Sequence, residues 1–440
     1  MSSPNAQSTP SRARYTVVFF ALALAMVTYI DRVAISQASG DIRRDLGFGP
    51  KEMGWVFSAF TIAYALFEIP GGWLGDRIGP RRVLLRVVSM WSLFTAATGL
   101  TWNLASMLVC RFCFGAGEAG CFPNLTKVFT IWLPSDERPR AQGVLWLSAR
   151  WGGAFTPALV ALILHFLNWR WAFALFGLLG VVWAVAFANW FRDRPADHPA
   201  VNAAELALLD GAERNAPAHA AVPWKRFVSS PSVWLLWLQY AGLSYGWYFY
   251  ITWLPTYLRE ARGMPLEKSA VLAGLPLFFG GIGCFVGGWI ARRLGRTAVG
   301  VGSARKSVAA LGMLGAGLLI LTVSHVESPM FAIFILGLAS FSNDLAIANA
   351  WAACMDVGGR YAGSLSGSMN MMGNVGGAIG AVVVGYILES GRVSADAIPS
   401  LGSWSTAFTV AAVVYGVAAV AWLMLDPVTS LDSTSAESAA

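Results

Sequence analysis

Long apolar runs separated by short polar segments extend along most of the chain. The runs lie near residues 15–37, 53–75, 83–102, 105–132, 141–166, 169–191, 232–257, 268–291, 305–325, 330–355, 363–388 and 404–425. Each is close to the ~20 predominantly apolar residues that a helix needs to cross a bilayer. Hydrophobic residues make up 56% of the 440 residues and charged residues 12%, so a water-soluble core is excluded. The pattern predicts an all-α membrane protein with twelve transmembrane helices.

A turn rich in glycine and arginine occurs once in each half of the chain. Residues 71–82 have the sequence GGWLGDRIGPRR, and residues 287–295 repeat it in part as GGWIARRLG. In both places an apolar run ends in glycines and then arginines, as expected where a membrane helix turns tightly and meets cytoplasmic water. The repeat predicts a duplicated chain, and therefore two pseudo-symmetric six-helix bundles.

The longest polar segment divides the twelve runs into six and six. The predicted organisation is an N-terminal tail at 1–14, a first bundle at 15–191, a linker at 192–230, a second bundle at 231–425 and a C-terminal tail at 426–440. Within the linker, Asn202 is expected to cap a short amphipathic helix that runs through Leu209, because Glu205 follows it by three residues.

The basic residues predict the orientation in the membrane. If both termini are cytoplasmic, the inner loops hold eighteen Lys and Arg residues and the outer loops hold eight. The positive-inside rule favours that orientation. The net charge of +7 does not indicate nucleic-acid binding, because the basic residues lie in separate loops rather than on one face. We expect a multi-pass protein of the bacterial cytoplasmic (inner) membrane that functions as a monomer.

Several patterns exclude other chemistry. The five cysteines lie inside predicted helices, so no disulfide framework is expected. Cys110 and Cys113 have no further Cys or His at zinc spacing, which argues against a metal site. The segment 115–120 matches G-x-G-x-x-G, but it lies in a bilayer-length run without a preceding strand. No catalytic triad is present, so neither an enzyme nor a bound cofactor is expected, other than a proton as coupling ion.

Charged residues inside the predicted spans are the strongest functional signal. They are Asp31, Arg32, Glu68, Arg111, Glu118, Arg150 and Asp344. A charge near the bilayer centre costs between ~3 and ~15 kcal/mol depending on the method, so each one needs a partner or a wet cavity. Arg111 and Glu118 share one helix face, which predicts either a static ion pair or a proton site. Asp31 is a candidate for proton or gating work, and the alternative is a salt partner of Arg32 or Arg111.

Two arginines are candidates for binding an anion. Arg32 and Arg150 each carry a guanidinium group, which binds a carboxylate through two parallel hydrogen bonds. The alternatives are snorkelling for Arg32 and pairing with Glu68 or another acid for Arg150. Glu68 lies one turn after Tyr64 and near the inner turn, which favours an inner gate, whereas the role of Asp344 stays open. The neutral candidates for contact with substrate are Tyr245, Trp351, Asn370 and Asn374.

The spans, the linker and the turn at 72–82 resemble the major facilitator superfamily. The turn is similar to the signature between that superfamily's second and third helices, with Pro80 where many members carry a basic residue. In the family the aspartate of this signature helps to latch the two halves together. The resemblance therefore implies gating roles for Asp76, Arg77 and Arg81, together with Glu68.

Four features resemble the anion:cation symporter branch of that superfamily, which includes bacterial hexuronate, galactonate and glucarate permeases and animal sialin. They are the segment 29–32 (YIDR), the pair Arg111 and Glu118, the segment 253–257 (WLPTY) and the segment 367–374 (GSMNMMGN). The resemblance implies that Arg32 holds the substrate carboxylate, that Tyr64 and Asn374 contact the substrate, and that Asp31, Arg111 and Glu118 form a proton-coupling network. Arg150 stands where sugar-acid permeases have a polar neutral or small residue, which suggests a dianion or a differently bound carboxylate.

We therefore expect a proton-coupled symporter that imports a small organic anion by alternating access. The anion is a sugar acid (a hexuronate, aldonate or aldarate) or another carboxylate. A phosphate-ester exchanger is disfavoured, because it would need matching arginines in both halves and the counterpart of Arg150 is Asn374. The alternatives are an organic anion exchanger and a membrane sensor that binds a carboxylate without accumulating it.

Overall fold

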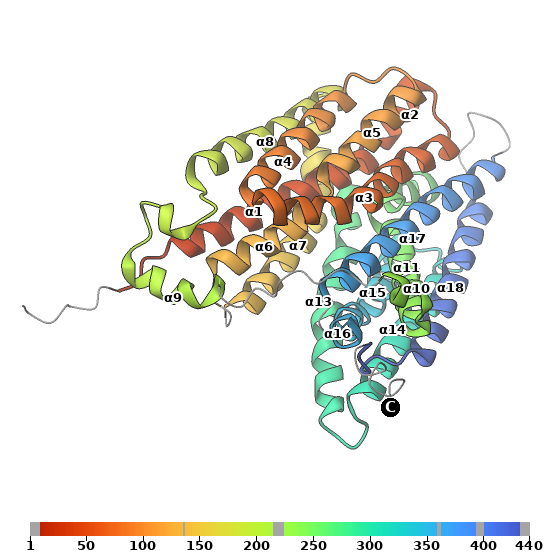
Figure 1. Ribbon diagram of the computed structural model, residues 1–440. Coiled ribbons are helices and arrows are strands. Elements are labelled where there is room, and N and C mark those ends of the chain that lie inside the picture. The colour runs from red at the N-terminus through yellow and green to blue at the C-terminus, as the bar shows by residue number, and fades with distance from the viewer. Residues whose placement is uncertain (1–8, 135–136, 214–223, 359–361, 393–399, 432–440) are drawn as a thin grey trace, which may run out of the picture.

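The computed structural model describes residues 9–134, 137–213, 224–358, 362–392 and 400–431, and all regular elements within these ranges are helical (Figure 1). The first half contains α1 (Ala13–Gln37), α2 (Ser39–Leu46), α3 (Pro50–Ile78), α4 (Pro80–Thr98), α5 (Leu104–Glu118), α6 (Cys121–Trp132), α7 (Arg138–Phe166) and α8 (Trp169–Trp190). The linker contains a 3-10 turn (Pro195–Asp197), α9 (Ala203–Glu213) and α10 (Trp224–Ser229). The second half contains α11 (Pro231–Thr252), α12 (Leu254–Thr256), a π-helical turn (Tyr257–Ala261), α13 (Leu266–Gly295), α14 (Val301–Val323), α15 (Pro329–Asp344), α16 (Ile347–Gly358), α17 (Ala362–Ser390) and α18 (Leu401–Met424).

Ten of the twelve predicted spans are long and apolar enough to cross a membrane by length and composition, within the residues described. The other two are α4 and α11. Three arginines in the first seven residues of α4 lower its mean hydropathy. The sequence of α11 is rich in Tyr and Trp, which are less apolar than Leu or Val. Both helices lie within the bundles, so the twelve predicted spans correspond to observed helices.

One predicted span is divided by a break between α5 and α6. Ala119 leaves the helical region, and Gly120 has a φ of 89°, which favours glycine. A Cβ atom on Gly120 would lie 2.8 Å from the Cα atom of Gly71 on α3. The break therefore combines a left-handed backbone with a close helix contact. It also makes Glu118 the last residue of α5, where its side chain points into the protein.

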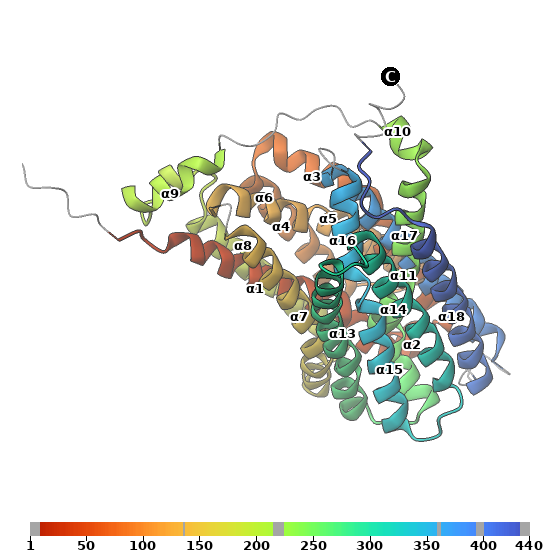
Figure 2. The same ribbon diagram turned by 90° about the horizontal axis from the view of Figure 1, so that it is seen from below.

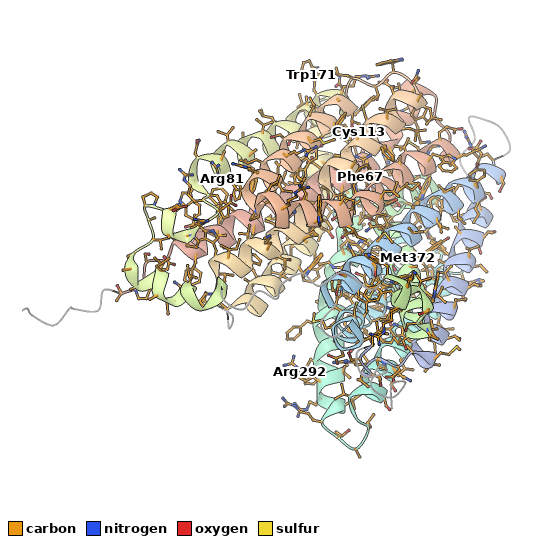
Figure 3. The ribbon with its side chains drawn as sticks, viewed as in Figure 1. Phe67, Arg81, Cys113, Trp171, Arg292 and Met372 are labelled. Carbon is orange, nitrogen blue, oxygen red and sulfur yellow. The ribbon has the colours of Figure 1, made fainter. Side chains whose placement is uncertain are left out.

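The helices form two bundles, drawn in red to yellow and in green to blue in Figure 1. The bundles contact each other through α3 and α17, α7 and α13, and α1 and α11. Figures 1 and 2 show that the bundles converge where α2 lies and diverge where α9 and the α13–α14 turn lie. We call these the α2 end and the linker end. Arg81 and Arg292, from the two repeated turns, lie in different bundles toward the linker end (Figure 3).

Polar contacts join the bundles at the α2 end. The hydroxyl of Ser39 lies 3.3 Å from that of Thr256 and accepts a hydrogen bond of 3.0 Å from Arg259. Arg43 pairs with Glu260. Each of these contacts crosses from the first bundle to the second. The α2 end is therefore closed in this conformation.

The linker helix is fastened to the start of α1. Asn202 accepts a hydrogen bond of 2.8 Å from the backbone N–H of Glu205, as predicted for a helix cap. The fully buried Glu205 carboxylate accepts hydrogen bonds from the backbone N–H groups of Ala13 and Arg14, at 3.2 and 3.1 Å, and pairs with the Arg14 side chain at 3.0 Å. A carboxylate at a helix N-terminus satisfies free N–H groups and the helix dipole. The first part of the linker is therefore bound to the first bundle.

Candidate functional site

Most of the charged side chains of the predicted spans are buried in the structure. Asp31 and Arg32 lie on α1, Glu68 on α3, Arg111 and Glu118 on α5, Arg150 on α7, and Asp344 on α15. The five fully or nearly fully buried ones, each with at most 5% exposure, are Asp31, Glu68, Arg111, Glu118 and Asp344. A buried charge is stable only with a partner. The partners divide these residues into three groups.

In the first group, Arg32 pairs with Glu118. The Nε atom of Arg32 donates a 2.5 Å hydrogen bond to Oε1 of Glu118, and a second guanidinium nitrogen contacts the same oxygen. The Glu118 side chain is fully buried, whereas 11% of the Arg32 side chain is exposed. The other oxygen of Glu118 has no hydrogen-bond partner among the described residues. The acid is therefore the more deeply buried member of the pair.

Aromatic rings surround the guanidinium of Arg32. Its Cζ atom lies 4.7 Å from the ring centroid of Tyr64, 5.3 Å from that of Phe60, 5.4 Å from that of Tyr29 and 5.8 Å from that of Phe122. Rings at these distances attract a cation through their π-electron faces. Tyr64 is thus beside Arg32, as expected of a residue of the same site, although contact with substrate stays a prediction.

Arg111 and Asp31 lie beside this pair. The Cζ atom of Arg111 is 5.3 Å from the centroid of Phe60, the same distance as that of Arg32, so both guanidinium groups contact this ring. Within the described residues, neither oxygen of Asp31 has a hydrogen-bond partner. The sequence suggested that Arg111 pairs with Glu118 on the same helix. The structure instead gives Glu118 a partner on α1.

The second group is an ion pair between Arg150 and Asp344, which belong to different bundles. A guanidinium nitrogen of Arg150 lies 3.1 Å from a carboxylate oxygen of Asp344. Asp344 is fully buried, and 14% of the Arg150 side chain is exposed. The Arg150 guanidinium also stacks 3.8 Å above the ring of Trp247, and Asn343 donates a 2.8 Å hydrogen bond to the other Asp344 oxygen. This pair fits the alternative that Arg150 is held by an acid, and it gives Asp344 a partner.

The third group also crosses between the bundles. Asn370 donates a 2.5 Å hydrogen bond to Glu68, and Asn374 donates a longer one of 3.5 Å to the other oxygen. Tyr248 in turn donates a 2.7 Å hydrogen bond to the side-chain oxygen of Asn374. The predicted gate residue and two predicted substrate residues therefore contact one another. Their roles stay predictions.

The remaining aromatic candidates lie on the second bundle. The Trp351 indole donates a 3.2 Å hydrogen bond to Tyr240, and its ring is 6.2 Å from that of Trp146 on α7. Tyr245 is buried, and a Cβ atom on Gly380 would lie 3.1 Å from its ring. Tyr245 therefore packs against α17. Its hydroxyl has no hydrogen-bond partner in the part of the chain that the structure describes.

The residues of the glycine-arginine turn lie toward the linker end. The backbone N–H of Arg81 donates a 2.9 Å hydrogen bond to Asp193, and its guanidinium donates one of 2.6 Å to the carbonyl of Ala188. Arg81 therefore holds the start of α4 against the end of α8 in the same bundle. Arg77 is exposed and lies over the Trp73 ring at 5.3 Å. The side chain of Asp76 lies outside the described part of the chain.

The specific pairing of Arg150 with Asp344 was not predicted from the sequence. A signal was present, because Asp344 is the sole acidic residue within the predicted spans of the second half and needs a cation from the first. Trp247, which stacks on Arg150, carried no comparable signal. It belongs to a run crowded with aromatic residues, and the sequence does not tell which of them faces a charge.

Comparisons with known proteins place this geometry in a family. Residues 21–381 match the family model described as Major Facilitator Superfamily. A protein named probable sulfoacetate transporter from Cupriavidus necator is 35% identical over 427 residues, which are 96% of each chain. A D-galactonate transporter from Escherichia coli O6:H1 is 30% identical over 404 residues, covering 88% of this chain and 92% of the relative. The crystal structure of a bacterial homolog of the human lysosomal transporter Spinster, inward-facing and occupied, gives a TM-score of 0.76 over 94% of this chain and 97% of that chain at 17% identity, a likeness of fold.

Proposed function

Since this chain belongs to the major facilitator superfamily, as its sequence suggested, we propose that it is a proton-coupled symporter that imports a small organic anion across the bacterial cytoplasmic membrane. The family is one of membrane transporters, and its fold alternates access to a site between two bundles. The observation that carries the proposal is the pairing of Arg32 with Glu118. This pair offers a site for an anion and a carrier for a proton in direct contact.

The anion binds at Arg32. The acid partner is fully buried, and 11% of the Arg32 side chain is exposed. A carboxylate approaching from the exposed side can accept two hydrogen bonds from it. Tyr64 lies against the same guanidinium at 4.7 Å. The relatives named for sulfoacetate and D-galactonate support a small organic anion as the substrate class.

The proton binds at Glu118. While Glu118 is ionised it attracts the Arg32 guanidinium and competes with an incoming anion. A proton on Glu118 removes that competition, so Arg32 becomes available to the substrate. Loss of the proton on the other side restores the pair and favours release of the substrate. Asp31 and Arg111, next to the pair, are assigned to the transfer of the proton.

The linker end faces the cytoplasm in this proposal. The excess of basic residues in the loops at this end supports the orientation. The bundles diverge at the linker end and contact each other through Ser39, Thr256, Arg43 and Glu260 at the α2 end. With that orientation the structure corresponds to an inward-facing state. Outward opening would require these contacts at the α2 end to separate.

Transport into right-side-out membrane vesicles tests the proposal. Vesicles containing the protein receive an inward proton gradient and radiolabelled D-galactonate or sulfoacetate. We expect accumulation that a protonophore abolishes. In Glu118→Gln, net accumulation should be lost, whereas exchange of labelled for unlabelled anion should continue, because an amide cannot carry the proton. Asp197→Asn, which changes an exposed linker carboxylate, is the matched control and should behave as the wild type.

Each alternative function gives a different result. Exchange without net accumulation in the wild type would identify an anion exchanger. Binding of the anion without movement across the membrane would identify a sensor. Gradient-driven accumulation that persists in Glu118→Gln would contradict the coupling role of Glu118.

A further inference from the structure

The pair of Arg150 and Asp344 has the same construction as the pair of Arg32 and Glu118. In both pairs the carboxylate is fully buried, and the arginine side chain is 14% or 11% exposed. In both pairs an aromatic ring lies against the guanidinium, Trp247 at 3.8 Å and Tyr64 at 4.7 Å. The protein therefore has two arginine side chains that are mostly buried and slightly exposed, each paired with a fully buried acid.

Gly280 on α13 leaves space for the ion pair of Arg150 and Asp344. A Cβ atom on Gly280 of α13 would lie 2.7 Å from the Asp344 oxygen that contacts Arg150, and 2.8 Å from the hydroxyl of Ser340. Both distances are shorter than a Cβ contact allows. Since α13 packs against both α7 and α15, a side chain at this position would disturb the ion pair. The contact between Arg150 and Asp344 thus depends on a residue of a third helix.

Aromatic side chains connect the two guanidinium groups. Phe122, 5.8 Å from Arg32, stacks on Trp146 with a centroid distance of 5.0 Å, and Trp146 lies one turn before Arg150 on α7. Tyr29, 5.4 Å from Arg32, is contacted from α7 as well, because a Cβ atom on Gly153 would lie 3.1 Å from its ring. Tyr29 also interacts electrostatically with Arg150, so Arg32 and Arg150 share this residue as a neighbour.

We propose that Asp344 is the counter-ion of a second anion subsite at Arg150, and that the transporter selects substrates with two anionic groups. This inference rests on the proposed function, with one anionic group of the substrate at Arg32. The other group replaces Asp344 at Arg150. A monoanion leaves the pair of Arg150 and Asp344 intact and gains nothing from it.

Displacement of Asp344 requires that its charge be neutralised. The charged or titratable groups that interact with Asp344 among the described residues are Arg150 on α7, Tyr250 on α11, Cys284 on α13 and Tyr415 on α18. Of these groups, the arginine alone carries a positive charge at neutral pH. When the substrate takes Arg150, a proton from solvent must bind to the Asp344 carboxylate. Binding of substrate at Arg150 is thus coupled to protonation of Asp344, as binding at Arg32 is coupled to protonation of Glu118 in the proposed function.

A different explanation is that the pair is a static link between the bundles. Burial of both partners and the contact across the interface would fit a link. A static link would affect the stability and the transport of every substrate alike. A counter-ion affects the preference between dianions and monoanions. The ratio of the two affinities therefore distinguishes the explanations.

The experiment measures binding to purified full-length protein in lipid nanodiscs by titration calorimetry. The probes are two pairs that match in size and differ in one anionic group, galactarate with D-galactonate and sulfoacetate with methylsulfonylacetate. We expect the wild type to bind the dianion of at least one pair about tenfold more tightly or better. In Arg150→Gln the ratio of dianion affinity to monoanion affinity should fall to about one. The dianion affinity should decrease, and the monoanion affinity should change little.

Further variants separate charge from packing. Asp344→Asn should bind the dianion more tightly than the wild type, because the competing carboxylate is gone. Where an unpaired Arg150 prevents folding of that variant, the double variant Arg150→Gln with Asp344→Asn removes both charges and should also give a ratio of about one. Asp356→Asn breaks the exposed pair with Arg305 in the second bundle and should leave the ratio unchanged.

The possible failures are distinguishable. A wild type that binds monoanion and dianion equally would overturn the inference and leave the proposed function intact. The inference would also be overturned, with the proposed function intact, if Arg150→Gln lowers the affinities for the monoanion and the dianion by the same factor, as a static link predicts. A wild type that binds none of the four probes and accumulates no anion would reject the proposed function, and the inference with it.

Discussion

Glu118 accepts its hydrogen bond from Arg32, which precedes it by 86 residues, rather than from Arg111 on its own helix. The break after Glu118 explains this choice, because α5 ends there and turns the side chain toward α1. Arg111 instead lies against the rings of Phe60 and Phe114, at 5.3 and 4.6 Å. The residues proposed to bind the proton and the anion are therefore adjacent by tertiary packing, which no spacing within one helix could reveal.

Arg32→Lys should weaken anion transport although it keeps the positive charge. A lysine ammonium is a point charge without the two parallel donors of a guanidinium. We expect the KM for uptake to rise about tenfold or more, and the rise should be smaller in Arg32→Lys than in Arg32→Ala. Uptake into vesicles over a range of substrate concentrations measures the KM of each variant.

The control is Arg305→Lys, which changes an arginine of the second bundle that pairs with Asp356 away from the site. Its uptake should match that of the wild type. An unchanged KM in both Arg32→Lys and Arg32→Ala would contradict the assignment of the anion to Arg32.

His198 in the linker should make local stability depend on pH. Its ring accepts a hydrogen bond of 3.1 Å from the backbone N–H of Ala200 and lies 4.4 Å from the ring of Trp190. Burial lowers the pKa of His198 below its usual value. The folded linker therefore favours neutral His198, so stability is unaffected above the unfolded pKa of ~6.5 and falls as the pH drops below it. Hydrogen exchange of residues 194–202, corrected for intrinsic rates, should become faster below that pH.

Two comparisons check this prediction. In His198→Gln the acceleration below ~6.5 should disappear, because the titrating group is absent. The loop between α14 and α15, which lies in the other bundle, serves as an internal reference in the same exchange experiment. Equal acceleration in the wild type and in His198→Gln would show that another group is responsible.

The alternation of apolar and polar segments predicted the fold well. Each run corresponds to one helix or to two helices joined by a break, and the repeated glycine-arginine turns mark corresponding ends of the two bundles. The break at Gly120 could not be predicted, because its position depends on the contact with Gly71, a residue distant in sequence. Hydrophobic periodicity reports which segments are buried in lipid and protein, but not which helices touch.

The sequence identified the charged residues of the spans but not their partners, and their roles in a site stay predictions. The cost of burying a charge in the bilayer singles out Arg32, Glu118, Arg150 and Asp344 from the sequence alone. Which acid meets which arginine depends on helix packing, on the break after Glu118 and on the space beside Gly280. These features arise from the tertiary structure.

Gly120→Ala should destabilise the first bundle and impair transport. The alanine Cβ would meet the Cα atom of Gly71 at 2.8 Å, in addition to the cost of a left-handed φ of about 1–2 kcal/mol. Relief of this contact must move α5 or α6 and so displace Glu118 from Arg32. We expect a lower midpoint of thermal unfolding in detergent and reduced uptake by the protein that remains folded.

The control is Gly416→Ala on α18, whose added Cβ atom meets nothing within 4 Å and which should be neutral or slightly stabilising. Equal midpoints for the two variants would contradict the prediction.

Glu68→Gln should shift the balance between conformations of the two bundles. Glu68 accepts hydrogen bonds from Asn370 and Asn374 across the interface, one at each carboxylate oxygen. A glutamine side chain has only one such oxygen, so its NH2 group would face the NH2 group of one of the two asparagines. Loss of a hydrogen bond to a charged group costs about 1.5–3 kcal/mol, which disfavours the present arrangement by roughly tenfold to a hundredfold relative to states that lack the contact.

Spin labels on cysteines at positions 82 and 292, in a background without the five native cysteines, report the separation of the bundles at the linker end. We expect the distance distribution of Glu68→Gln to differ from that of the unmodified background, because Glu68 no longer holds α3 against α17. Asp356→Asn is the matched control, since Asp356 pairs with Arg305 within the second bundle. Its distribution should be that of the background. If Glu68→Gln leaves the distribution unchanged as well, the contact of Glu68 with the two asparagines does not control the movement of the bundles, and the gating role of Glu68 is wrong.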